Sequence, residues 1–360
     1  MFKQGVQLAC VIAATSLSTP TTIADTVTPR QSDNPLVTGA FVQLTQASAS
    51  AEKTWWQDQL AAMKAVGMDT LVIQYVGYGD QYFYPTQVHG AVPIQTDPLE
   101  YILAAADDTH IQVFMGLWLN DAFWNDKFDG DANLARNIAT LRELYSRYRS
   151  HPSLAGWYIP EEISDHTQRK PQLAEALLEY MGRISTLAHE TTHLPVMISP
   201  YFGQRPDAET YADWWDQTAL PRMNIDILAL QDGVGTHRTT IAESRPVYQA
   251  LMPVLQRHGV AFWANNESFD QTHGWPVDED GWAAQPVGFD SFIDQVHSTA
   301  PFVKKIITFE FTNYMTPLVE GRSQELYEAY HAYHASVTSG RRQATETKAP
   351  RLPAGSTVKE

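Results

Sequence analysis

The chain has 360 residues, of which 44% are hydrophobic and 11% aromatic, so it can bury a large core and is not a disordered protein. Its net charge is −16, from 41 acidic and 25 basic residues, and it has no basic block that would neutralise a row of phosphates. This charge argues against nucleic acid and against an anionic membrane surface as partners. A neutral or cationic substrate fits it better than a polyanion.

Residues 1–24 have the pattern of a secretory signal peptide. Lys3 precedes an apolar run from Val6 to Leu17, and small residues up to Ala24 suit cleavage before Asp25. An uncleaved anchor is the alternative, but the run is short for a bilayer. The only cysteine, Cys10, lies in this segment, so the mature chain would have neither a disulfide nor a thiolate. We therefore expect a periplasmic or secreted protein that has no membrane contact after cleavage.

The rest of the chain alternates apolar strand patterns with helical patterns, after a polar segment at 25–36 that is typical of a linker. We expect strands at 38–44, 69–75, 111–118, 154–159, 194–200, 225–231, 260–266 and 304–311. Helical patterns cover 51–66, 98–107, 132–149, 171–189, 240–258, 288–299 and 324–335. Prolines 246 and 253 predict a break or bend in their helix, and the segment with Trp214 and Trp215 is expected to be a loop.

This alternation predicts the fold class. Repeated strand and helix units match a closed (β/α)8 barrel better than an open sheet. No linker-like break interrupts residues 37–336, so we expect one domain there. The tail, 337–360, is polar with scattered prolines and is predicted to be disordered.

In such barrels the chemistry lies at the carboxyl ends of the strands. The polar and aromatic residues there form an acidic, amide-rich set that suits a polyhydroxylated ligand. From this set we predict substrate contacts for Gln43, Gln74, Trp118, Asn120, Glu161, Tyr201, Gln231, Asp232, Asn266 and Glu310. The ends of two strands also carry the candidate catalytic acids, Glu162 and Glu267.

The stretch LAGWYIPEEI, from Leu154 to Ile163, places a pair of glutamates directly after a buried strand. Glycosidic cleavage needs two carboxyl groups, one protonated and one ionised. Glutamates on the fourth and seventh strands resemble the pattern of the retaining glycosidases of clan A. That resemblance implies that Glu162 is the general acid/base and Glu267 the nucleophile. Clan A enzymes usually carry asparagine before the acid, where this chain has Glu161.

Several phrases, TGAFVQL, LVIQY, GWYIPEEI, LALQDGVG and FWANNESF, resemble an uncharacterised bacterial family of glycosidase-like barrels that is catalogued as a domain of unknown function. The resemblance covers about residues 37–320. It implies the barrel fold more strongly than it implies the reaction.

Each candidate acid also has a structural alternative. Adjacent residues on an extended segment point in opposite directions, so one of Glu161 and Glu162 should enter the site, and we favour Glu162. Both could instead serve a helix N-terminus, and Glu267 could be a solvated loop acid. Glu310 either lines the site or pairs with a buried cation, and Asp232 could be a turn residue before Gly233.

The aromatic and metal-ligating residues leave further alternatives open. Five tryptophans could stack on sugars or simply pack in the core: Trp118, Trp124, Trp263, Trp275 and Trp282. Glu161, Asp165 and His166 could chelate a divalent ion, although we predict no metal and no cofactor.

We therefore predict a secreted or periplasmic glycoside hydrolase with a carbohydrate substrate, and the oligomeric state stays open. The alternatives are a non-catalytic carbohydrate-binding barrel in an exopolysaccharide system and a metal-dependent hydrolase or deacetylase.

Overall fold

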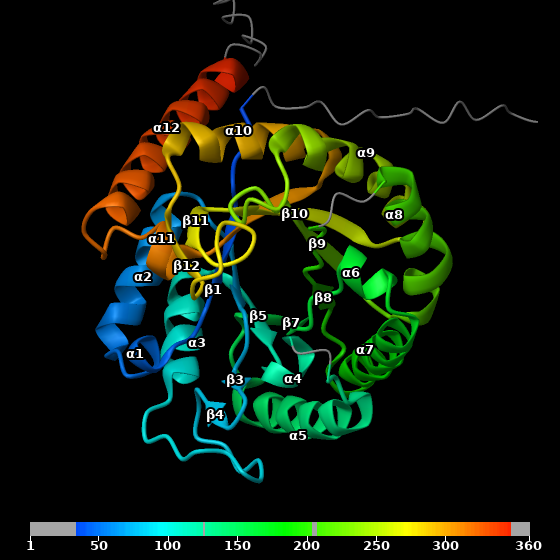
Figure 1. The fold of residues 1–360 in the computed structure, drawn as a ribbon. Coiled ribbons are helices and arrows are strands. Elements are labelled where there is room, and N and C mark those ends of the chain that lie inside the picture. Colours follow the sequence, from blue (N-terminus) through cyan, green and yellow to red (C-terminus); the bar gives the residue numbers. More distant parts are fainter. Residues whose placement is uncertain (1–33, 125–126, 204–206, 347–360) are drawn as a thin grey trace, which may run out of the picture. The chain divides into compact units, whose positions relative to one another are not determined.

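The computed structural model describes residues 34–124, 127–203 and 207–346. Parallel strands close a barrel in the ring order β1-β13-β10-β9-β8-β7-β5-β2 (Figure 1). The barrel strands are β1 (Gly39–Val42), β2 (Thr70–Ile73), β5 (Gln112–Gly116), β7 (Leu154–Ile159), β8 (Val196–Ile198), β9 (Ile227–Gln231), β10 (Ala261–Glu267) and β13 (Lys305–Phe309). All eight expected strands are confirmed, and the fold is the predicted single (β/α)8 barrel.

Long helices surround the ring of strands (Figure 1). They are α2 (Lys53–Ala65), α3 (Pro98–Thr109), α5 (Gly130–Tyr148), α7 (Pro171–Thr192), α8 (Ala208–Trp214), α9 (Ile241–Arg257), α10 (Phe289–Thr299) and α12 (Arg322–Glu346). The short helices are α1 (Gln46–Ala49), α4 (Asp121–Trp124), α6 (Asp165–Gln168) and α11 (Phe311–Tyr314). Two small sheets are formed by β3 (Gly77–Tyr78), β4 (Gln81–Tyr82) and β6 (Trp118–Leu119), and by β11 (Phe269–His273) with β12 (Ala283–Pro286).

The helix after β8 was missed in the sequence. The segment expected to be a loop forms α8 and continues through a π-helical turn, Trp215–Ala219. Asp207 caps α8 by accepting from the Thr210 amide, and Tyr211 and Trp215 bury their rings on one face. Helix α8 has only 7 residues, too few for a helical period to stand out in the sequence.

Two other helical predictions also need correction. Helix α9 is continuous across Pro246 and Pro253, so a break at these prolines is wrong, while the alternative of a bend stays a prediction. Helix α12 runs to Glu346, so the prediction of disorder from 337 is wrong for 337–346. Val337 is buried, and the Arg341 side chain donates to the Asn34 carbonyl, so the helix has packing partners beyond 336. The predicted signal peptide at 1–24 lies outside the described residues, as do residues 25–33 of the predicted linker at 25–36 and residues 347–360 of the predicted tail.

The interior of the barrel is filled by one side chain in two along each strand. This interior cluster consists of Phe41, Val72, Phe114, Tyr158, Met197, Ile227, Ala229 and Ile307. The alternate residues point outward and pack against the helices. Because this alternation continues to the strand ends, it decides which polar residues reach the barrel mouth. Among the described helices, none combines the length and apolar character needed to cross a membrane.

Candidate functional site at the barrel mouth

The two adjacent glutamates after β7 face opposite sides of the chain. Glu161 is 1% exposed, and its Oε1 accepts from the Asn133 amide of α5 at 3.2 Å. Glu162 lines a pocket on the barrel mouth. The predicted substrate contact of Glu161 is therefore wrong, because its side chain points outward from the barrel into the layer between β7 and α5.

The pocket beside Glu162 has a volume of about 300 Å³. Its walls come from α4, α6, the start of α7 and the segments that follow β8, β9 and β11. In Figure 1, α4, α6 and the β11–β12 hairpin lie inside the ring of outer helices. The side chains that line it include Trp124, Glu162, His166, Leu173, Tyr201, Arg238 and Trp275. Tyr201, a predicted substrate contact, thus lies in the same pocket as Glu162.

Burial raises the pKa of Glu162 to about 7, while a hydrogen bond from Gln231 and the charge of Arg238 lower it. Gln231 is itself held by a bond from its Nε2 to the Ser199 carbonyl, at 2.8 Å. A carboxyl group that titrates near neutral pH can give and take a proton during a reaction, which is the property a general acid/base requires.

Glu267 ends β10 and is 2% exposed. The Thr236 amide donates to its Oε2 at 2.9 Å, and a Cβ on Gly235 would lie 2.8 Å from the Glu267 Cβ. The turn after β9 therefore covers this side chain, and only glycine fits at 235. Burial and the charge of Asp232 raise the pKa of Glu267, whereas the Thr236 and Gly235 amides and Arg238 lower it.

Arg238 connects the two acids electrostatically, since its charge lowers the pKa of both Glu162 and Glu267. Its guanidinium lies 4.9 Å from the Tyr201 ring centre and 5.4 Å from that of Trp275. Arg238 is not among the site residues predicted from the sequence. It comes from a loop, where no periodicity marks a side chain as facing the site.

Amide side chains line the mouth on the inward positions of other strands. Gln43 and Gln74 continue the inward alternation of Phe41 and Val72. Gln43 hydrogen-bonds Tyr75 and borders a second hollow near α11. On β10, the inward amide is Asn265, which donates to the Ser199 hydroxyl at 3.1 Å.

Asp232 and Asn266 point away from the mouth. The Asn266 amide donates to Asp232 Oδ2 at 2.6 Å, and the Thr299 hydroxyl of α10 donates to Asn266 Oδ1 at 3.1 Å. Burial raises the pKa of Asp232. Both residues are at most 1% exposed, so they join β9 and β10 to the outer helix layer. The substrate contacts predicted for them are wrong.

Glu310 also faces outward and caps α11. Its carboxylate accepts from the amides of Thr312, at 2.8 Å, and Asn313, at 2.6 Å. The residue is fully buried, so neither predicted role, lining the site or pairing with a buried cation, describes it. The backbone amides of Thr312 and Asn313 stabilise the Glu310 carboxylate instead.

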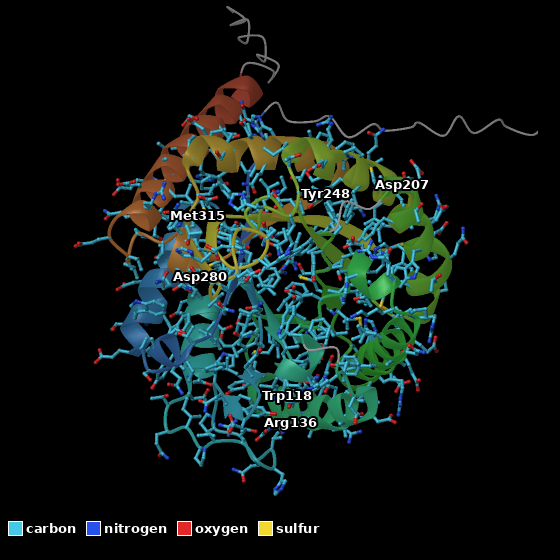
Figure 2. All side chains as sticks on the ribbon, viewed as in Figure 1. Trp118, Arg136, Asp207, Tyr248, Asp280 and Met315 are labelled. Atoms are coloured by element: carbon cyan, nitrogen blue, oxygen red, sulfur yellow. The ribbon has the colours of Figure 1, made fainter. Side chains whose placement is uncertain are left out.

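Trp118 and Asn120 hold the loop structure below the mouth. Trp118 is 5% exposed, its Nε1 donates to the Gly79 carbonyl at 2.6 Å, and the Arg136 guanidinium lies 4.6 Å from its ring centre. Figure 2 shows Trp118 and Arg136 next to each other at α5. Asn120 accepts from the Phe123 amide at 3.3 Å. Burial of Trp118 argues against its predicted substrate contact, whereas half-buried Asn120 stays a predicted contact.

The alternative metal site does not assemble, because Glu161 points toward α5 while Asp165 accepts from the Gly203 amide at 2.9 Å. In the described part of the chain, only one group of three potential ligands converges: His273, Asp278 and Asp280, on the β11–β12 hairpin.

The comparisons identify the family. A model of the family described as "Domain of unknown function (DUF4434)" matches residues 37–320. The chain belongs to this family. The DUF4434 chain is 26% identical over 216 residues to "Uncharacterized protein YbcH" of Escherichia coli strain K12, across 58% of this chain and 69% of that protein. The resemblance to a family catalogued as a domain of unknown function, over about residues 37–320, is thus confirmed.

Solved structures that share the fold of this DUF4434 barrel include proteins named as glycosidases. A Bacteroides thetaiotaomicron protein titled as a candidate alpha-L-fucosidase has a TM-score of 0.73 at 21% identity, and the match covers 85% of this chain and 97% of that one. A beta-D-glucuronidase from Dictyoglomus thermophilum has a TM-score of 0.52 at 13% identity, over 85% of this chain and 50% of that one. At such identities the likeness establishes the fold alone.

Proposed function

We propose that this DUF4434 protein is a periplasmic or secreted glycoside hydrolase that cleaves an oligosaccharide or polysaccharide with retention. Glu162 is the general acid/base in this proposal, and Glu267 is the nucleophile. The observation that carries it is the pair of glutamates at the ends of β7 and β10, both under the influence of Arg238. Proteins of the same fold that are named as glycosidases support the proposed substrate class, a carbohydrate.

The reaction needs two steps. Ionised Glu267 attacks the anomeric carbon while the Glu162 carboxyl gives its proton to the glycosidic oxygen, which breaks that bond and releases the first product. Ionised Glu162 then takes a proton from water, and the hydroxide oxygen displaces Glu267 from the anomeric carbon. The second product leaves, and both carboxyl groups return to their starting states.

The surrounding groups act on both acids. Burial and the charge of Asp232 raise the pKa of Glu267 to about 8, and Arg238 with the amides of Gly235 and Thr236 opposes that rise in favour of the ionised form that the nucleophile requires. Burial favours the protonated form of Glu162, which the leaving oxygen requires. The partly exposed amide of Gln231, which hydrogen-bonds Glu162, is suited to bind sugar hydroxyls beside the acid.

One observation favours a second candidate, a carbohydrate-binding barrel without turnover. Glu267 is 2% exposed and lies under the turn that contains Gly235 and Thr236. The Asp232 charge also raises its pKa, which opposes ionisation. A barrel of this kind would bind glycans at the mouth and leave their bonds intact.

Digestion of a glycan library in water enriched in oxygen-18 separates the two candidates. We expect products of lower mass that carry one heavy oxygen at the new reducing end. Glycan binding without any new reducing end would contradict the hydrolase and support the binding barrel.

A further inference from the structure

We propose that the pocket beside Glu162 is the leaving-group subsite, which holds the sugar ring that departs when the bond breaks. This inference rests on the proposed function. It deepens that proposal because it requires a carbohydrate on both sides of the cleaved bond, so the substrate class is an oligosaccharide or polysaccharide and not a sugar with a small leaving group.

The position of the two acids gives the pocket its direction. Glu162 lines the pocket, whereas Glu267 does not belong to its lining and lies under the Gly235 turn. In a two-carboxylate mechanism the acid contacts the leaving oxygen, and the nucleophile contacts the anomeric carbon from the other side. A pocket that touches the acid alone therefore lies on the leaving-group side.

Two exposed indoles form the walls of this pocket. Trp124 is 46% exposed and Trp275 is 62% exposed, although tryptophan is highly buried on average. Trp124 comes from α4 and Trp275 from the β11–β12 hairpin, and both line the pocket. Their aromatic surface can cover the C–H face of a sugar ring.

Both indoles are held by neighbours. The Phe123 ring packs edge-on against Trp124, with the centroids 4.8 Å apart. The Arg238 guanidinium lies 5.4 Å from the centre of the Trp275 ring. Each exposed ring thus has a packing partner before binding, which limits its motion and lowers the conformational entropy that a ligand has to overcome.

Trp282 supplies a matched control from the same hairpin. It is 56% exposed, yet it does not belong to the pocket lining and packs its ring 5.8 Å from that of Phe269. Replacing Trp282 removes an exposed indole of equal size from outside the proposed subsite.

The kinetic test compares Trp124→Ala, Trp275→Ala and Trp282→Ala on two kinds of substrate. The probes are a panel of cello-, laminari-, manno- and galacto-configured tetrasaccharides and the glycosyl fluorides of the same sugars, whose fluoride is too small to fill the pocket. We expect each pocket variant to lose roughly tenfold in kcat/KM on the cleaved tetrasaccharide. The same variants should keep the parent rate on the fluoride, and Trp282→Ala should keep it on both.

Equal losses on tetrasaccharide and fluoride would overturn the subsite, and so would a tetrasaccharide rate that neither pocket variant changes. Trp124→Phe and Trp275→Phe retain an aromatic face and should recover part of the rate, which guards against a folding defect in the alanine variants.

A binding measurement keeps the inference testable if the hydrolase proposal fails. Calorimetry with the same tetrasaccharides should show weaker binding to Trp124→Ala and Trp275→Ala than to the parent and to Trp282→Ala. Equal affinities would contradict the subsite. A parent protein that binds but releases no product contradicts the proposed function instead.

Discussion

Two regions rich in aromatic residues use them in opposite ways. In the loop after β2, Tyr82 and Tyr84 are 3% and 0% exposed. At the mouth, Trp124 and Trp275 are 46% and 62% exposed and line the pocket beside Glu162. Aromatic content alone therefore does not identify a carbohydrate site. The partners of each ring decide whether it stabilises a loop or stays available to a ligand.

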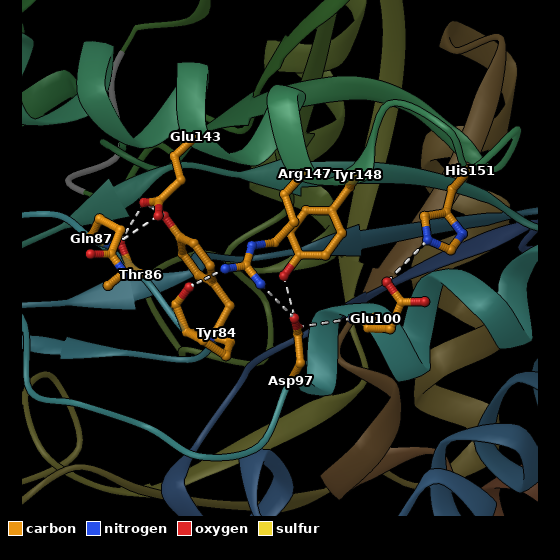
Figure 3. A network of polar contacts seen from close by, with 10 residues as sticks. Tyr84, Thr86, Gln87, Asp97, Glu100, Glu143, Arg147, Tyr148 and His151 are labelled. Atoms are coloured by element: carbon orange, nitrogen blue, oxygen red, sulfur yellow. Dashed lines mark hydrogen bonds and ion pairs between the residues drawn. The ribbon is translucent and has the colours of Figure 1, made fainter.

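The loop after β2 is anchored to α5 by polar contacts (Figure 3). Glu143 accepts from the Tyr84 hydroxyl at 3.1 Å and from the Gln87 amide at 2.8 Å. Arg147 donates to the Pro85 carbonyl at 2.7 Å and pairs with Asp97 at 3.3 Å. This anchored loop should contribute to stability, whereas the mouth should contribute to turnover.

The largest expected effect is on turnover at the mouth. Glu162→Gln should lower kcat/KM by about 10² to 10⁴, because the amide cannot protonate the leaving oxygen. Glu161→Gln is the matched control, since Glu161 faces α5 and its substitution leaves the mouth intact. Measurement of new reducing ends with both variants gives the comparison, and equal losses would contradict the assignment of Glu162.

The pH dependence of kcat/KM should change when Arg238, the cation at the mouth, is replaced. With the pKa of Glu162 raised to about 7, its protonated fraction falls as the pH rises through that value, and kcat/KM should fall with it. Arg238 lowers this pKa, so Arg238→Met should raise it and move the alkaline limb to higher pH. Arg147→Met, on α5 where it anchors the loop after β2, is the control. A limb that stays in place in Arg238→Met would argue against Glu162 as the acid.

The smallest expected effect is the loss of one anchor. Glu143→Ala leaves the Tyr84 hydroxyl and the Gln87 amide without their acceptor, and should lower the free energy of unfolding by about 1 to 3 kcal/mol. Denaturant titration gives this value, and kcat/KM of the folded variant should match the parent. A large loss of activity at unchanged stability would show that the loop belongs to the site.

The fold was readable from the sequence because eight apolar strands and their intervening helices leave strong periodic signals. Helix α8 was missed because its 7 residues are too few to show a helical period. The end of the last helix was predicted too early, because contacts distant in the sequence hold its final turns. Val337 is buried, and Arg341 donates to the Asn34 carbonyl.

The site was readable only in part. The alternation of strand side chains separated Glu161 from Glu162, and the same rule predicts that Asp232, Asn266 and Glu310 point outward. These three were selected as polar strand-end residues without that rule. Arg238 could not be predicted, because the path of its loop depends on contacts with Tyr201 and Trp275, which come from other parts of the chain.

The central claim is that Glu162 and Glu267 act on one glycosidic bond, and chemical rescue by azide tests it most directly. Glu267→Ala should be nearly inactive on a dinitrophenyl glycoside of the cleaved sugar, and added azide should restore release with a glycosyl azide of inverted anomeric configuration. Glu162→Ala with azide should give the retained configuration. Parent-like turnover by Glu267→Ala without azide would contradict the account.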